Sequence, residues 1–99
     1  MMKAKRYTRV MDGFIKAELQ DGYLHADGNI GYFIYHGKGQ WYAIDCPTGL
    51  SLYSGEKRKD VITLPEGIKE SFLKYRLTDR YKEKVSEFAA MICEEESKH

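Results

Sequence analysis

Residues 32–54 read YFIYHGKGQWYAIDCPTGLSLYS, and this stretch decides the fold class. Turn-forming residues interrupt it twice, at Gly37-Lys-Gly-Gln40 and at Cys46-Pro-Thr-Gly49. The segments between them are rich in aromatic and β-branched residues, which is typical of strands bounded by turns. The stretch therefore predicts three short antiparallel strands, at residues 32–36, 41–45 and 50–53.

Successive side chains of a strand point to opposite faces of a sheet, so a four-residue connection at each turn divides these strands into two faces. The first face is the expected floor for the helices because it carries the aliphatic residues. It collects Tyr32, Ile34, His36, Trp41, Ala43, Asp45, Leu50 and Leu52. The second face is rich in tyrosine and collects Phe33, Tyr35, Tyr42, Ile44, Ser51 and Tyr53. A one-residue error in either connection would exchange residues between the faces.

Two more strands are expected on the N-terminal side. Residues 14–20 and 23–26 flank the dipeptide Asp21-Gly22, whose tolerance of positive φ favours a two-residue hairpin turn. In that register Leu19 lies opposite Leu24 on an apolar face, while His25 pairs with Glu18 on the other.

The chain turns helical after Ser54. Ser54 can cap a short segment through Ile62, and Pro65 suits the first turn of a second helix. Thr78 is the expected cap of the last helix. The apolar residues at helical spacing are Ile68, Phe72 and Tyr75 in the second helix, and Tyr81, Val85, Phe88, Ala89 and Ile92 in the last. A strand at Val61–Leu64 is the competing interpretation.

We therefore expect one α+β domain over residues 1–99. An N-terminal antiparallel β-meander of about five strands, at residues 7–54, precedes two or three C-terminal α-helices, at residues 55–96, packed on one face. Ninety-nine residues suffice for one hydrophobic core and a modest pocket. Two cysteines, the lack of an apolar leader and the lack of a run of ~20 apolar residues indicate a cytoplasmic protein without membrane contact.

No catalytic constellation, metal site or cofactor site stands out. His25, Asp27, His36, Asp45 and Cys46 do not form a set with the spacing of metal ligands. A base for Cys46 would have to be His36, which the expected register puts on the opposite face. An enzyme is therefore disfavoured; a small hydrolase or metal enzyme would need a pocket that brings His36 to Cys46 or Asp45.

The tyrosine-rich face is the candidate partner-binding surface, because tyrosine buries a large area at low rotamer cost and keeps a polar tip. The hypothesis assigns contact to Phe33, Tyr35, Tyr42 and Tyr53, and electrostatic steering to Lys57, Arg58 and Lys59. In the alternative, the N-terminal hairpin or a helix simply covers these aromatic residues. The same face could also serve a homodimer.

The net charge is only +1, but residues 1–10 carry four basic side chains and residues 57–59 three more. Nucleic-acid binding through segments 3–9 and 57–59 is therefore the alternative function. The three central strands contain a single basic residue, Lys38, which disfavours readout of base edges by the sheet.

A longer pattern carries a resemblance. It comprises Trp41-Tyr-Ala-Ile-Asp45, Thr48-Gly49-Leu50, Ser54-Gly55 and Arg58-Lys59-Asp60-Val61-Ile62. It resembles small phage and prophage accessory proteins that read roughly W-x-x-x-D-x-x-T-G-L, then a strand and a basic helix start. The resemblance covers about a fifth of the chain. It implies a small inhibitor that binds a host protein, including defence nucleases such as CRISPR effectors. A similar sheet and helix occur in the arm domains of phage integrases, whose basic strand residues this chain lacks.

Overall fold

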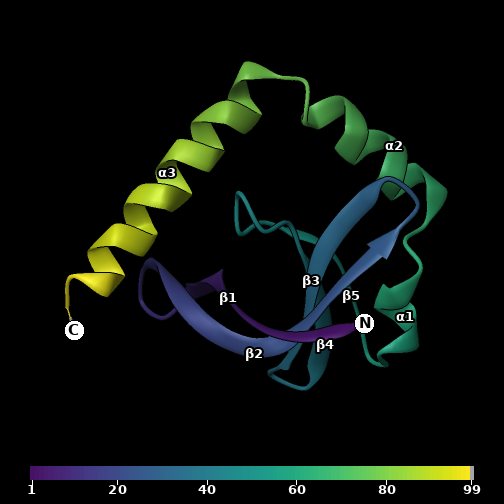
Figure 1. Cartoon of the computed structure of the whole chain (residues 1–99), viewed down its shortest axis with the longest axis horizontal. Coiled ribbons are helices and arrows are strands. Elements are labelled where there is room, and N and C mark those ends of the chain that lie inside the picture. The colour runs from purple at the N-terminus through teal and green to yellow at the C-terminus, as the bar shows by residue number, and fades with distance from the viewer. Residues whose placement is uncertain (99) are drawn as a thin grey trace.

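Every strand of the N-terminal half pairs with the next strand along the chain, giving a five-stranded antiparallel sheet in the order β1-β2-β3-β4-β5. The computed structural model describes residues 1–98. The strands are β1 (Met2–Met11), β2 (Ile15–Asp27), β3 (Ile30–Gly37), β4 (Gln40–Ile44) and β5 (Ser51–Gly55), and the helices are α1 (Lys59–Ile62), α2 (Glu66–Tyr75) and α3 (Asp79–Glu96). The helices follow the sheet in sequence, so the expected α+β class is confirmed (Figure 1).

The strand number agrees with expectation, but two of the strands differ. The hairpin expected at Asp21-Gly22 is wrong, because β2 runs through both residues and pairs with β1 along its length. The hairpin turn lies at an earlier Asp-Gly dipeptide, Asp12-Gly13, where Gly13 has φ +76° and the Asp12 amide donates to the Phe14 carbonyl at 3.0 Å. The meander therefore begins at Met2 and not at residue 7.

Gly22 has a packing role inside β2. A Cβ placed there would overlap the Ile34 carbonyl oxygen and come within 2.7 Å of the Phe33 ring. A glycine in a strand often marks such a close approach of another backbone. Because the side chain is absent, β2 can bend closely over β3, and Figure 1 shows β1 and β2 strongly curved.

The faces expected for β3 and β4 are correct, because Gly37 pairs with Gln40 across a two-residue turn and Tyr35 therefore pairs with Tyr42. The expected register fails at β5. A β-bulge between Ala43 and Ile44 lets Ala43 pair with Tyr53 and Ile44 with Ser51. A bulge adds one residue to one strand and so changes the face of those beyond it. Tyr53 accordingly lies on the helix-covered face with Ala43.

The helices cover that first face of the sheet. The core there is formed by Ile30, Tyr32, Ile34, Ala43, Val61, Leu64 and Phe72. Helix α1 contains Val61 and Ile62, so the competing strand at Val61–Leu64 is wrong. Thr78 caps α3 as expected, since its hydroxyl accepts the Tyr81 amide at 3.2 Å. Figure 1 shows α3 running from the end of α2 toward the β1–β2 hairpin tip, and α3 packs on β2.

The second face is covered by the sheet itself. Its core consists of Phe33, Tyr35 and Ile44, against which Ala4 of β1 and Leu24 of β2 pack. The Arg9 amide of β1 donates to the Gly49 carbonyl at 3.4 Å, so the outer edge of β1 meets the β4–β5 connection. The sheet thus curls toward a closed barrel, and its second face becomes an interior.

Candidate binding groove

The aromatic residues predicted to bind a partner do not share one exposed face. Phe33 and Tyr35 are buried beneath the curled β1–β2 hairpin, with exposed fractions of 0% and 8%. Tyr42 is half-buried beside them, whereas Tyr53 packs against the core under the helices. The structure therefore brings Phe33, Tyr35 and Tyr42 together and separates Tyr53. In the alternative drawn from the sequence, the N-terminal hairpin covers these aromatic residues, and this is what the structure shows for Phe33 and Tyr35.

The curl leaves an open cavity of about 540 Å³ on the second face, and we call this cavity the groove. All five strands and three of their connections contribute to its lining. The lining residues are Arg9, Val10, Met11, Asp12, Glu18, Gln20, Tyr35, Gly37, Lys38, Tyr42, Ile44, Gly49, Leu50 and Ser51. Two predicted contact residues, Tyr35 and Tyr42, thus remain at a cavity, although only Tyr42 keeps substantial exposure.

The two tyrosines of the groove form an aromatic stack. Tyr35 and Tyr42 are a cross-strand pair with ring centroids 5.2 Å apart and an interplanar angle of 24°, and Phe33 continues the stack at 6.1 Å from Tyr35. Burial raises the pKa of Tyr35; the nearby Thr8 hydroxyl opposes this shift, while Tyr42 and Glu18 add to it. The phenol of Tyr35 therefore remains protonated at neutral pH and can donate a hydrogen bond.

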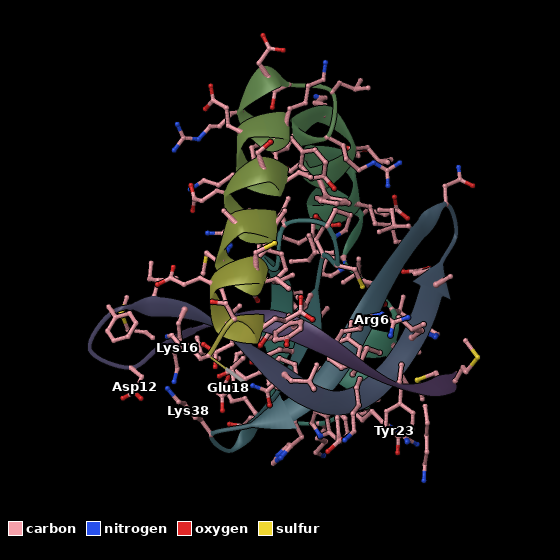
Figure 2. All side chains as sticks on the ribbon, turned by 60° about the vertical axis from the view of Figure 1, so that its left-hand side comes forward. Arg6, Asp12, Lys16, Glu18, Tyr23 and Lys38 are labelled. Carbon is pink, nitrogen blue, oxygen red and sulfur yellow. The ribbon has the colours of Figure 1, made fainter. Side chains whose placement is uncertain are left out.

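Charged side chains surround one end of the groove. Figure 2 shows Asp12, Lys16, Glu18 and Lys38 together at this end, whereas Arg6 and Tyr23 lie elsewhere on the sheet. Asp12 and Lys16 form an exposed ion pair at 3.9 Å. Within residues 1–98, Glu18 and Lys38 form no ion pair, so both charges are available at the groove.

Arg9 belongs to the basic segment proposed for nucleic acid, but its guanidinium is used inside the fold. Its Nε donates to the Thr48 carbonyl at 2.6 Å, and Nη1 pairs with the Glu87 carboxylate of α3 at 2.6 Å. The guanidinium also lies over the Phe88 ring, 5.4 Å from its centroid. The Arg9 hydrogen bond and charge lower the pKa of Glu87. Arg9 therefore joins β1 to α3.

The other basic residues remain on the surface. Lys57, Arg58 and Lys59 are exposed before and at the start of α1. Lys5 pairs with Asp21 at 3.7 Å, and Arg6 donates to the Lys5 carbonyl at 2.7 Å. Figure 1 places the beginning of β1 and helix α1 on the same side of the molecule, so the two basic segments are not at opposite ends.

The β1–β2 turn presents apolar side chains to solvent, which sequence reasoning missed. Met11, Phe14 and Ile15 are 60%, 61% and 54% exposed. We call these three residues the hairpin tip. Met11 and Asp12 also line the groove, so the tip and the groove adjoin. The signal was present, since Asp12-Gly13 lies between Met11 and Phe14 and indicates a hairpin turn with large apolar flanks.

The residues that carried the phage resemblance have structural roles. The Asp45 carboxylate is buried and accepts hydrogen bonds from the Thr48 hydroxyl at 2.6 Å and from the Tyr81 hydroxyl of α3 at 2.9 Å. Gly49 has φ +68°, and a Cβ there would overlap the Phe88 ring. The turn at residues 45–50 therefore attaches α3 to the sheet, which accounts for the Asp, Thr and Gly of that pattern.

His25, Asp27 and Cys46 also serve the fold. His25 Nε2 lies 2.8 Å from the Ile62 carbonyl, so the expected His25–Glu18 pair is wrong. Asp27 accepts the Leu64 amide at 2.8 Å and pairs with Lys69 at 3.1 Å, and these contacts lower its pKa. Cys46 packs on the second face, and burial raises the pKa of its thiol. Across residues 1–98, no group of three or more His, Cys, Asp or Glu side chains is arranged to hold a metal ion.

No family model matches the chain, and neither a curated protein nor a solved structure shows significant similarity to it. Among the helices of residues 1–98, none has both the length and the apolar character required to cross a membrane.

Proposed function

We propose that the protein is a non-catalytic protein-binding module whose contact surface is the hairpin tip together with the adjoining groove. This contact surface keeps part of the surface predicted from the sequence and replaces the rest. Tyr42 and Tyr35 remain as the floor of the groove, while Met11, Phe14 and Ile15 supply the exposed apolar area.

The exposure of the hairpin tip carries this proposal. Met11, Phe14 and Ile15 are each more than half exposed within a span of five residues. Adjacent exposed apolar side chains mark sites where a soluble protein contacts a partner. The tip gives a projecting apolar surface, and the groove gives a concave aromatic surface with charged walls. This combination of anchors and a polar rim is the common composition of a protein interface.

The class of partner follows from the resemblance alone. A small phage-type inhibitor would bind a bacterial host protein, and a defence nuclease such as a CRISPR effector is one such protein. The Asp45, Thr48 and Gly49 residues of that resemblance stabilise the turn against α3, so they support the fold of such an inhibitor and not its contact surface. We include the inhibitor role in the proposal on this basis.

The proposal is tested by a tagged pull-down from bacterial lysate after nuclease treatment. The test variant is Met11→Ser/Phe14→Ser, which changes two exposed side chains without opening the core. The matched control is Leu73→Ser/Leu77→Ser, which also removes two exposed apolar side chains, near the end of α2. We expect a protein that is retained by the wild type and by the control, and lost with the test variant.

Three outcomes would contradict the proposal. Equal retention by both double variants would remove the hairpin tip from the interface. Recovery of only the protein's own copies would indicate a homodimer. Recovery of nucleic acid in a parallel pull-down without nuclease, weakening steeply as salt rises, would favour the alternative function, nucleic-acid binding through segments 3–9 and 57–59.

A further inference from the structure

We propose that the groove accepts a cationic side chain, a lysine or arginine of the bound partner. This inference rests on the proposed protein-binding function and specifies the chemistry of the residue that enters the groove. The aromatic faces of Tyr35 and Tyr42 and the unpaired carboxylate of Glu18 carry it, and these three residues come from three different strands.

The aromatic stack provides the surface on which a cation would rest. The ring face of a tyrosine carries negative potential and attracts an ammonium or guanidinium group within ~6 Å of its centroid. Tyr42 is the more exposed member of the stacked pair and lines the groove, while Tyr35 backs it at 5.2 Å. Ile44 completes an apolar floor against which the methylene groups of a lysine or arginine would pack.

Glu18 provides the countercharge. Its carboxylate lines the groove from β2, is exposed, and forms no ion pair within residues 1–98. Glu18 and Tyr35 both line the groove, and the charge of Glu18 adds a small contribution to the raised pKa of the Tyr35 phenol. A cation bound over the tyrosines would therefore gain a charge-assisted hydrogen bond to Glu18.

Thr8 fixes the face on which Glu18 stands. Thr8 pairs with Glu18 across β1 and β2, so the two side chains share the inner face of the sheet. The Thr8 side chain is fully buried, and its hydroxyl lies close enough to the Tyr35 phenol to lower that pKa. Glu18 is exposed and lines the groove, so its carboxylate is the acceptor that a bound cation would meet.

The basic side chains near the groove leave the Glu18 carboxylate free to bind a cation. Arg9 is directed to Glu87 and Thr48 and does not neutralise Glu18. Lys16 is paired with Asp12 at 3.9 Å. Lys38 is the remaining positive charge on the groove lining and would repel a bound cation. Removing Glu18 or Lys38 should therefore change affinity in opposite directions, which an apolar ligand would not reproduce.

The test is a titration of the full chain with small probes at low salt, monitored by the NMR chemical shifts of the backbone amides. The probes are Nα-acetyl-lysine amide, the uncharged Nα-acetyl-norleucine amide and the acidic Nα-acetyl-glutamate amide. We expect the lysine probe to shift amides along the groove and to bind several-fold more tightly than the norleucine probe. Glu18→Gln should weaken its binding by about two- to fivefold, the range for an exposed ion pair. Lys38→Gln should strengthen it, and the exposed Glu70→Gln control on α2 should leave it unchanged.

Equal binding of the norleucine probe, tighter binding of the glutamate probe, or no groove shifts with any probe would overturn the cation assignment. So would a Glu18→Gln variant that binds the lysine probe as the wild type does. These results would leave the protein-binding function standing, provided that Met11→Ser/Phe14→Ser still abolishes capture of a protein from lysate. Loss of that capture difference would instead refute the proposed function, whatever the probes show.

Discussion

Gly49→Ala should destabilise the fold far more than a matched glycine substitution, because Gly49 is the point at which α3 contacts the β4–β5 turn. Gly49 and Gly28 have nearly the same backbone conformation, with φ +68° and +64°. A Cβ at Gly28 would have no atom within 4 Å, whereas one at Gly49 would overlap the buried Phe88 ring. Comparing Gly49→Ala with Gly28→Ala therefore separates the cost of positive φ from the cost of the contact with Phe88.

The magnitude follows from two terms. Placing a side chain at positive φ costs roughly 1–2 kcal/mol, and this term applies to both substitutions. Overpacking against Phe88 adds roughly 1–3 kcal/mol at Gly49 alone. We therefore expect a loss of about 2–5 kcal/mol for Gly49→Ala and of about 1–2 kcal/mol for Gly28→Ala. A domain of this length has a free energy of unfolding on the order of 5–15 kcal/mol, so the first loss is a large fraction of it.

The assay is urea unfolding of the two variants and of Phe88→Leu alone and combined with Gly49→Ala. Leucine removes the far atoms of the ring that the new Cβ would meet. The double variant should therefore be more stable than the sum of the single losses predicts, by about 1–3 kcal/mol. Equal losses for Gly49→Ala and Gly28→Ala, or strict additivity with Phe88→Leu, would refute the reasoning.

Further substitutions test the close approach inside β2 and the hydrogen bonds of buried tyrosines. Gly22→Ala should cost about 3 kcal/mol or more by urea unfolding, because its Cβ would meet a backbone carbonyl, whereas Gly67→Ala in α2, with open space around it, should stabilise by up to about 1 kcal/mol. Tyr81→Phe should lower stability by roughly 1.5–3 kcal/mol in thermal unfolding, because it removes a hydrogen bond to the Asp45 carboxylate; an unchanged midpoint would contradict that role. Burial, with the charge of a nearby aspartate, raises the pKa of Tyr32 from 10.0 to about 12. The contribution of protonated Tyr32 to the free energy of unfolding is therefore present below pH 10 and is lost as pH rises toward 12. Urea unfolding between pH 8 and pH 11 should show this decline, and Tyr32→Phe should reduce it.

Local sequence patterns predicted most of the architecture, because turns, strand faces and helix starts depend on residues that are close together in the sequence. The glycines of the Gly37–Gln40 turn set the register of β3 and β4, and helical spacing together with Thr78 set the start of α3. The faces of Tyr35 and Tyr42 were therefore correct. What these patterns could not supply was the curl that buries one of those faces.

The errors came from contacts between residues distant in sequence. Three Asp-Gly dipeptides have the same intrinsic turn preference, but only Asp12-Gly13 and Asp27-Gly28 turn the chain. The close approach of β3 to Gly22 keeps Asp21-Gly22 inside β2. The β-bulge beside Ala43 moves Tyr53 to the helix-covered face, and nothing in the local pattern indicates it. Arg9 was interpreted as part of a basic segment because its partner, Glu87, is 78 residues away.

The candidate site was predictable only in part for the same reason. Tyr42 was placed on the correct face of the sheet and lines the groove there, but Phe33 and Tyr35 were assigned exposure that the β1–β2 hairpin removes. Met11, Phe14 and Ile15 have the composition of core residues, so only the position of the turn shows that they project into solvent. Tyr35→Ala is accordingly a poor probe of binding, because truncating a buried aromatic ring costs roughly 3–5 kcal/mol of stability.

Site-specific photo-cross-linking tests the central claim, that the hairpin tip contacts a protein, most directly. A benzoylphenylalanine placed at Phe14 would be compared in bacterial cells with the same group placed at Leu77, which is 87% exposed and belongs to the α2–α3 connection. The account predicts a discrete protein adduct from position 14 that is absent from position 77 and lost when Met11→Ser is added. The same adducts from both positions, or no protein adduct from position 14 in a folded chain, would contradict it.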